Sequence, residues 1–241
     1  MTSDLVYETK LRGLTKWVFG AFIAGAVLSL GLSGLELAGQ TLDPNWHDVD
    51  APYADATVES IVFAQAPLVV AFFLVYVFGI VAFLKWQYRV AKRTRTYADH
   101  IADKTPAWTV GWWFVPFANL VMPYRVISRL FVANDPGAAV GERGEAPGKL
   151  LGVYWTLWLF SNYLSNVSFK LYMGKGASDY DAAIRRAEVS TWMDLAISVV
   201  DIVLVVVTVR WMARLRDWHL AKLDQVASQA APGDPPGIRP I

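Results

Sequence analysis

The sequence predicts an all-α integral membrane protein, a four-helix bundle with a re-entrant or interfacial helical segment on its cytoplasmic side. Of its 241 residues, 55% are hydrophobic and only 18% are charged, whereas charged residues make up about a quarter of a typical soluble domain. The apolar residues form four blocks that are each long enough to cross a bilayer as a helix. Lysine and arginine gather in alternate connections between these blocks, which is the pattern of a multi-pass protein.

The first predicted span covers residues 14–38, where charge appears only near the ends, at Lys16 and Glu36. Its apolar run is about twice as long as the core of a secretory signal peptide, and no A-x-A cleavage site follows it. We therefore expect a retained transmembrane helix. Its glycines favour close packing against a neighbouring helix; they are Gly20, Gly25, Gly31 and Gly34.

The second predicted span covers residues 58–88. The connection before it, residues 39–57, contains four aspartates and neither lysine nor arginine, which places it outside the cell. Pro67 lies near the start of the span, where a membrane helix tolerates proline. The far end is basic, and it is expected to continue as a helix past the bilayer and to attract anionic lipid headgroups at roughly 1 kcal/mol per charge. The predicted headgroup contacts are Lys85, Arg89, Lys92, Arg93 and Arg95.

Residues 106–131 form the predicted re-entrant or interfacial segment. It is uncharged from Pro106 to Tyr124, yet proline and glycine recur within it and weaken a continuous helix. Ten lysines and arginines lie between residues 85 and 149. A spanning segment would carry one of its basic flanks across the membrane, against the positive-inside rule.

The third and fourth predicted spans cover residues 150–172 and 190–212. The chain leaves the fourth span through three arginines, so alternation places both termini in the cytoplasm. We assign residues 1–222 to a single transmembrane domain. Residues 223–241 are rich in proline and glycine and are predicted to form a disordered tail.

Polar residues within the predicted spans form a candidate cluster in the outer half of the bundle. Their depths follow from a rise of about 1.5 Å per residue in each helix. The cluster could be an outward-facing cavity or a proton-linked site, or it could only provide interhelical hydrogen bonds that fix the packing. Its members are Glu36, Gln65, Asn162, Asn166, Lys170, Asp194 and Asp201.

Most catalytic constellations are missing from the sequence. There is no cysteine, which excludes disulfides, thiolate metal sites and cysteine nucleophiles. The three histidines, His47, His100 and His219, lie outside the predicted spans, so haem held between helices is not expected. No HExxH, GxGxxG, Walker or GxSxG motif occurs. We expect no catalytic residue, no cofactor and no metal site.

The stretch FLKWQYRVAKRT and the segment from Pro106 to Phe131 resemble the bacterial domain of unknown function 4328 family, whose members are small multi-span membrane proteins. Thr94 and Arg95 depart from its pattern, since an asparagine is expected shortly after the arginine-rich turn. The resemblance implies a membrane location and a helical fold, and it brings no activity. The matching positions are Trp86, Arg89, Trp108, Gly111, Trp112, Trp113, Pro116, Asn119, Leu120, Pro123 and Tyr124.

The sequence as a whole favours a non-enzymatic structural, regulatory or interaction protein of the bacterial inner membrane. Its partners would be anionic lipids on the cytoplasmic side, together with a second copy or another protein, and not nucleic acid. The alternative is a small oligomeric transporter or channel-like protein that uses Asp194, Asp201 and Lys170. A third alternative, an enzyme at the cytoplasmic interface that uses Asn119, Arg125 and His100, has no motif to support it.

Overall fold

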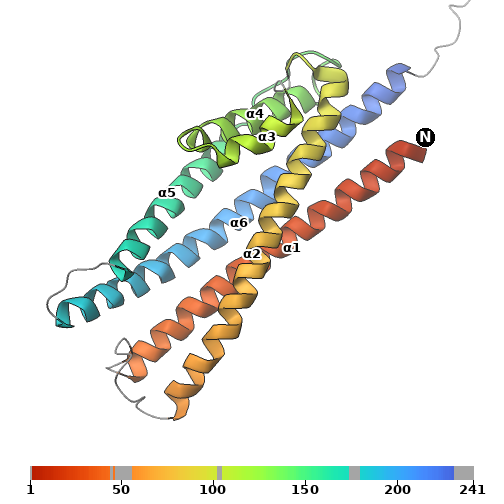
Figure 1. Cartoon of the computed structure of the whole chain (residues 1–241). Coiled ribbons are helices and arrows are strands. Elements are labelled where there is room, and N and C mark those ends of the chain that lie inside the picture. The colour runs from red at the N-terminus through yellow and green to blue at the C-terminus, as the bar shows by residue number, and fades with distance from the viewer. Residues whose placement is uncertain (1, 44–45, 47–55, 102–104, 174–179, 231–241) are drawn as a thin grey trace, which may run out of the picture. The chain divides into compact units, whose positions relative to one another are not determined.

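The computed structural model describes residues 2–43, 46, 56–101, 105–173 and 180–230, and these residues form helices joined by turns, without a strand (Figure 1). This confirms the predicted all-helical class. The long helices are α1 (Thr2–Leu42), α2 (Ala56–Ala98), α5 (Lys149–Tyr172) and α6 (Tyr180–Ala230). The short elements are α3 (Pro106–Gly111), η1 (Trp112–Phe114), η2 (Ala118–Leu120) and α4 (Met122–Asn134).

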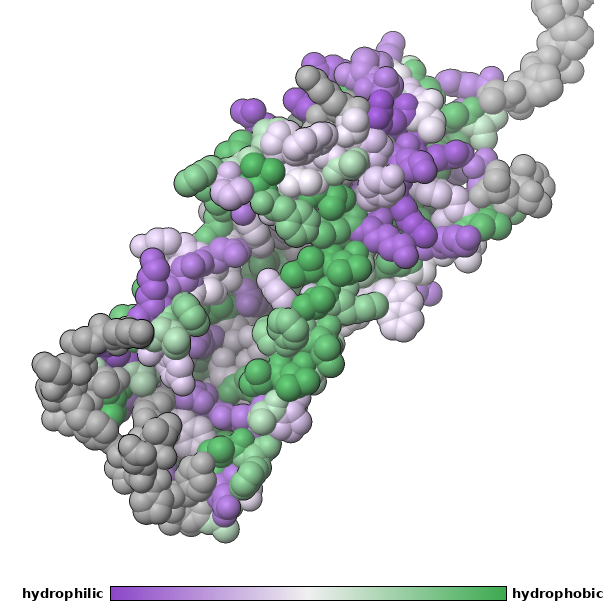
Figure 2. Space-filling model, in the orientation of Figure 1, coloured by the Kyte–Doolittle hydropathy of each residue, from purple (hydrophilic) through white to green (hydrophobic). Residues whose placement is uncertain are grey.

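Three helices are long and apolar enough to cross a membrane: Asp4–Leu42, Ala56–Ala98 and Ile184–Gln229. In their most apolar windows only 17%, 17% and 22% of the residues are buried inside the structure. Figure 2 shows such an apolar surface along the middle of α2. Surface of this kind is unfavourable in water and suits lipid. These three helices are candidate membrane spans, in agreement with the predicted membrane protein. The 24-residue α5 is more polar, because its sequence includes Asn162, Asn166 and Lys170.

Two helices extend beyond the limits that the sequence predicts for the spans. Helix α2 runs on through its basic end to Ala98, as its helical spacing of lysine and arginine predicts. Helix α6 continues to Ala230, so the predicted disordered tail is wrong for residues 223–230. The cause is a set of contacts made by Lys222 and Gln225, described below. The rest of that tail, residues 231–241, and most of the 39–57 connection, His47 included, lie outside the described residues.

The chain divides into two compact units, where the sequence prediction assigns one transmembrane domain. Unit 1 consists of residues 1–15, 84–151 and 210–241, and unit 2 consists of residues 16–83 and 152–209. The twelve largest fully buried side chains of the described chain all belong to unit 1. Unit 1 therefore contains the most completely buried large side chains, whereas the spanning helices of unit 2 present many large apolar side chains outward.

The core of unit 1 is built around tryptophans. Trp86 and Trp211 are fully buried and meet edge to face, with ring centroids 6.1 Å apart. The Trp86 indole N–H donates a hydrogen bond of 3.1 Å to the hydroxyl of Thr15, so that its polar atom is satisfied. Phe131 on α4 packs against the ring of Trp218 on α6 at 5.6 Å. These contacts fix the ends of α1, α2 and α6 around α4.

In unit 2, side-chain contacts link the four helical segments in the order α2, α1, α6, α5. Gly79 on α2 permits the closest approach, because a Cβ there would lie 3.3 Å from the Phe22 ring and from the Ala21 Cβ on α1. Ser33 of α1 and Ser198 of α6 share a hydrogen bond of 3.0 Å. The prediction that the glycines of the first span provide the packing is wrong for Gly20, Gly31 and Gly34, around which a Cβ would find open space.

Candidate functional site

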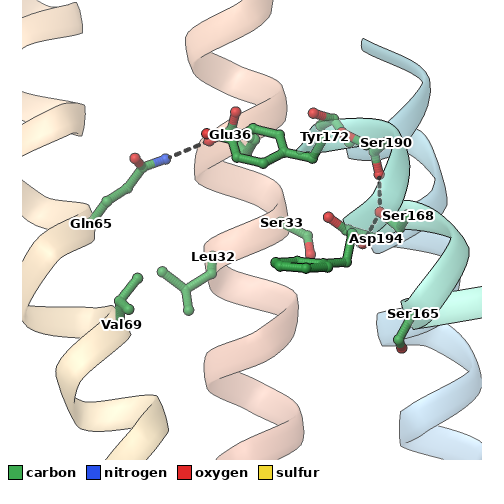
Figure 3. A pocket seen from close by; sticks show the side chains of 12 residues that line it. Leu32, Ser33, Glu36, Gln65, Val69, Ser165, Ser168, Tyr172, Ser190 and Asp194 are labelled. Carbon is green, nitrogen blue, oxygen red and sulfur yellow. Dashed lines mark hydrogen bonds between the residues drawn. The ribbon is translucent and has the colours of Figure 1, made fainter. Parts of the chain in front are cut away.

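Unit 2 contains a polar cavity of about 390 Å³ to which all four of its helical segments contribute. We call it the groove (Figure 3). Two carboxylates, an amide and several hydroxyl groups face it, together with apolar and aromatic side chains. Its lining residues are Leu32, Ser33, Glu36, Gln65, Val69, Ser165, Ser168, Phe169, Tyr172, Ser190, Thr191 and Asp194.

The carboxylate of Glu36 is held by two N–H donors. The Gln65 side-chain amide of α2 donates to its Oε2 at 3.0 Å, as Figure 3 shows, and the Trp46 indole N–H donates to its Oε1 at 2.8 Å. Each oxygen of the Glu36 carboxylate therefore accepts a hydrogen bond from an N–H group outside α1.

The carboxylate of Asp194 is oriented by α5. The Ser168 hydroxyl lies 2.7 Å from Asp194 Oδ1 and 3.3 Å from the backbone oxygen of Ser190. Because a hydroxyl has one proton, the shorter contact to the carboxylate is the main hydrogen bond. Asp201, two turns further along α6, receives a bond of the same length from Ser161, but it does not line the groove.

The structure brings together part of the polar cluster that the sequence predicts. Glu36, Gln65 and Asp194 line one cavity. Asn162, Asn166 and Lys170 do not, because they lie on the exposed face of α5. The Asn162 and Asn166 side chains donate instead to carbonyl groups of their own helix, at 2.7 and 2.8 Å. The equal spacing of these three residues predicts a shared face correctly, but that face points away from α6.

Sequence reasoning missed the hydroxyl groups of the groove. Ser161, Ser165 and Ser168 follow each other at spacings of four and three residues, which places them on one side of α5. Ser161 donates a hydrogen bond to Asp201 of α6, and Ser168 donates one to Asp194 of the same helix. The spacing of these serines, and not that of the asparagines, therefore indicates which face of α5 packs against α6.

The uncharged segment 106–121 is a chain of short helices anchored to α2 by Gln87. The buried Gln87 amide donates to the Thr109 carbonyl at 2.9 Å and accepts from the Trp113 indole N–H at 3.0 Å. The Trp108 and Trp112 rings pack with centroids 4.7 Å apart. Gly111 makes room for them, since a Cβ there would lie 3.2 Å from the Trp108 ring. The prolines and the glycine of this segment thus interrupt the helix, as the sequence predicts.

Four apolar side chains of this segment project from unit 1, and we call them the apolar ridge. Phe117 is 86% exposed and Phe114 is 69% exposed. Phe117 also has φ of 62°, in a region that a bulky residue rarely adopts. Such strain persists only where the surrounding structure enforces it. The ridge consists of Phe114, Phe117, Leu120 and Val121.

The basic residues predicted to contact lipid lie in unit 1 with the ridge, at the end of α2. Lys85 and Lys92 are exposed. Arg93 forms an ion pair with Asp4, and Arg95 pairs with Asp99 at 2.8 Å. Exposed ion pairs of this kind contribute about 0–1 kcal/mol to stability, so neither pair restrains its arginine side chain strongly.

A buried polar network surrounds His219 in unit 1. The Asn134 amide donates to the Thr94 hydroxyl at 3.0 Å and to the Leu130 carbonyl at 2.7 Å, which uses both of its protons. Its oxygen faces His219 Nδ1 at 2.7 Å, so we assign the imidazole proton to Nδ1. His219 Nε2 is then the acceptor for the Tyr7 hydroxyl at 2.9 Å. Thr94, the position that departs from the family pattern, is therefore a member of this network.

Burial strongly disfavours protonation of this histidine. Burial, together with the positive charge of Arg93, lowers the pKa of His219 from 6.5 to about 3. Burial raises the pKa of the Tyr7 and Tyr97 hydroxyls in the same way. The network is therefore neutral at physiological pH. Its residues belong to unit 1 and lie outside the spans that the sequence predicts.

Lys222 fixes the turn that follows α4. Its ammonium, fully buried, donates to the carbonyls of Asp135, Ala138 and Ala139 at 2.8, 2.6 and 3.2 Å. Gln225, one turn later, donates to the Pro136 carbonyl at 2.7 Å. Burial lowers the pKa of Lys222, opposed by nearby carboxylates. These bonds explain why α6 continues to Ala230.

The Asp135 carboxylate completes the same turn. Burial raises the pKa of Asp135, but hydrogen bonds from the N–H groups of Glu145 and Gly137, at 2.7 and 2.9 Å, leave it below its ordinary value. Gly144 is required here, because a Cβ would lie 2.1 Å from the Asp135 Cβ. Within the described residues, no group of three or more histidines, aspartates or glutamates could hold a metal ion.

Comparison with known proteins matches residues 50–217 to a family model described as "Domain of unknown function (DUF4328)". Neither a search of curated proteins nor a search of solved structures found a match. The matched region contains the resembling positions from Trp86 to Tyr124, as well as α5 and the groove carboxylate Asp194. On this match over most of its length, the chain belongs to the family of the domain of unknown function DUF4328.

Proposed function

We propose that this chain is a non-enzymatic protein of the bacterial inner membrane with a structural, regulatory or interaction role, exerted through unit 1 at the cytoplasmic surface. It crosses the membrane four times, through α1, α2, α5 and α6, and both termini lie inside. The single observation that carries the proposal is the apolar ridge, in the same unit as the basic end of α2. An apolar anchor combined with basic residues is what a stable contact with anionic lipid requires.

The energetics favour insertion of the ridge into a lipid surface. Burying a phenylalanine side chain stabilises by about 1.5–3 kcal/mol relative to leaving it in water, so Phe114 and Phe117 together supply several kcal/mol. Lysines near an anionic leaflet add roughly 1 kcal/mol each, and Lys85 and Lys92 are exposed. Tryptophans such as Trp108, which is 48% exposed, are typical of the headgroup region.

Contact with lipid is tested by an environment-sensitive fluorophore on a single cysteine introduced at Ala118, beside Phe117. The chain has no cysteine of its own, so the label is unique. In vesicles of phosphatidylcholine with phosphatidylglycerol, we expect blue-shifted emission and quenching by brominated lipid, because the ridge lies among the acyl chains. The label should be less quenched in the F114S/F117S variant and in phosphatidylcholine alone.

A label on the exposed Ala139 is the matched control, since it lies in the turn after α4 and should report water in both vesicles. A K85Q/K92Q variant should remove the preference for the anionic vesicles and keep the ridge intact. Quenching at Ala118 that is equal in both vesicles and equal in all variants would contradict the proposed contact.

The topology is tested with a membrane-impermeant thiol reagent on single cysteines at Thr9 and Ala227, both exposed residues near the two ends of the chain. Four spans place both on the cytoplasmic side, so both should react in inverted vesicles and neither in right-side-out vesicles. Three spans would place them on opposite sides. Cysteines at Ala107 and Ala139 apply the same test to the segment 106–121, and their labelling from opposite sides would show that it spans.

The groove supports a second candidate function, in which several copies of the chain assemble into an oligomer that transports a small solute. Among the residues that the sequence nominates for this role, Asp194 lines the groove and Lys170 does not. A solute would therefore meet Glu36 and Asp194. That observation leads to a more specific inference.

A further inference from the structure

We propose that the groove of unit 2 binds a small organic monocation, a primary alkylammonium ion. The proposal does not depend on the contact between unit 1 and lipid. It rests on three properties of the groove: the sign of its charges, the kind of polar atom that faces it, and the aromatic side chains at its wall.

The charges of the groove select a cation. Among its twelve lining residues the charged ones are Glu36 and Asp194, both acidic. They come from different helices, α1 and α6, so the charge belongs to the cavity and not to one helix face (Figure 3). A cation bound in the cavity would be attracted by both carboxylates.

The polar atoms of the groove suit a donor of several hydrogen bonds. An ammonium group has three N–H donors and no acceptor. Asp194 receives one hydroxyl bond, at 2.7 Å from Ser168, and its carboxylate has capacity for further donors. Ser165 and Ser190 line the same cavity. A primary ammonium is therefore a better match than a quaternary one, which donates no N–H bond.

The aromatic wall suits the organic part of the ligand. Phe169 and Tyr172, both 64% exposed, line the groove on α5. Aromatic faces attract cations and cover alkyl groups. A cavity of about 390 Å³ lies in the range of small-molecule sites, roughly 300–1,000 Å³. Divalent metal ions fit less well, because two carboxylates on separate helices do not form a compact set of oxygen ligands.

The test is isothermal titration of n-butylammonium into the full-length protein in lipid nanodiscs. The probe is expected to bind to the wild type, and n-butanol, of similar shape and without charge, is not. Asp194→Asn should weaken binding at least about tenfold, because it removes one partner of a charge-assisted pair. Glu36→Gln, which keeps an oxygen for the Gln65 and Trp46 donors, should weaken it similarly.

Asp201→Asn is the matched control. Asp201 lies on the same helix as Asp194 and receives an equivalent serine hydrogen bond of 2.7 Å, but it does not line the groove. The D201N variant should therefore bind n-butylammonium as tightly as the wild type. Equal losses in D194N and D201N would overturn the site. Failure of the wild type to bind n-butylammonium, or equal binding of n-butanol, sodium or tetramethylammonium, would overturn the ligand class. If D194N does not fold, the comparison of E36Q with D201N decides.

Discussion

Replacing Lys222 by methionine is expected to lower the free energy of unfolding by about 3 kcal/mol, because the loss of hydrogen bonds from a charged donor, about 1.5–3 kcal/mol each, is partly offset by the relief of burying the ammonium charge. The substitution removes three such bonds and leaves the carbonyls of Asp135, Ala138 and Ala139 without their donor. Methionine fills a similar volume, so the loss reports the ammonium and not a cavity. Thermal unfolding in detergent, followed by circular dichroism, measures the effect.

The change should also be local. Arg143 lies on the turn that Lys222 holds, so trypsin should cleave after Arg143 faster in the K222M variant than in the wild type. Lys149→Met is the matched control, because Lys149 is exposed at the start of α5. Equal melting temperatures and equal cleavage rates in K222M and K149M would show that the buried ammonium does not organise the turn.

Acidification is expected to destabilise unit 1 through His219. Its folded-state pKa of about 3 lies below the ordinary value of 6.5, so the folded state excludes a proton that the unfolded state binds. The stabilisation is complete above pH 6.5 and is lost as the pH falls towards 3. Between about pH 8 and about pH 5 protonation of this group alone lowers the free energy of unfolding by about 2 kcal/mol, and by pH 3 the loss is about 4 kcal/mol.

The measurement is the melting temperature as a function of pH for the wild type and for the H219Q variant. Glutamine does not titrate, so H219Q should start less stable at pH 8 and lose less on acidification, and the two curves should converge. His100→Gln removes an exposed histidine and should keep the slope of the wild type. A slope in H219Q equal to that of the wild type would assign the acid sensitivity to carboxylates elsewhere.

The sequence predicts the helical class and the membrane character well because both depend on local composition. The long apolar runs become α1, α2 and α6, and the basic spacing after Lys85 predicts correctly that α2 continues beyond the apolar run. The interruption of the segment 106–131 also follows locally, because each proline removes a backbone donor.

The buried contacts of unit 1 could not be predicted in this way. Tyr7, Thr94, Asn134 and His219 come from four separate parts of the chain, and each reads in sequence as an ordinary polar residue outside the spans. Only the packing of α4 against the helix ends brings them together. Similarly, the choice between the serine face and the asparagine face of α5 depends on where α6 lies, which no property of α5 alone determines.

The backbone at Phe117 imposes one more consequence. A positive φ favours glycine or asparagine, and an aromatic ring that is 86% exposed gains nothing from water. Both considerations make phenylalanine the wrong residue for the folding of unit 1 taken alone. The cost of exposing the Phe117 ring to water is removed only when an apolar environment covers the ring. The folded chain by itself does not provide that environment.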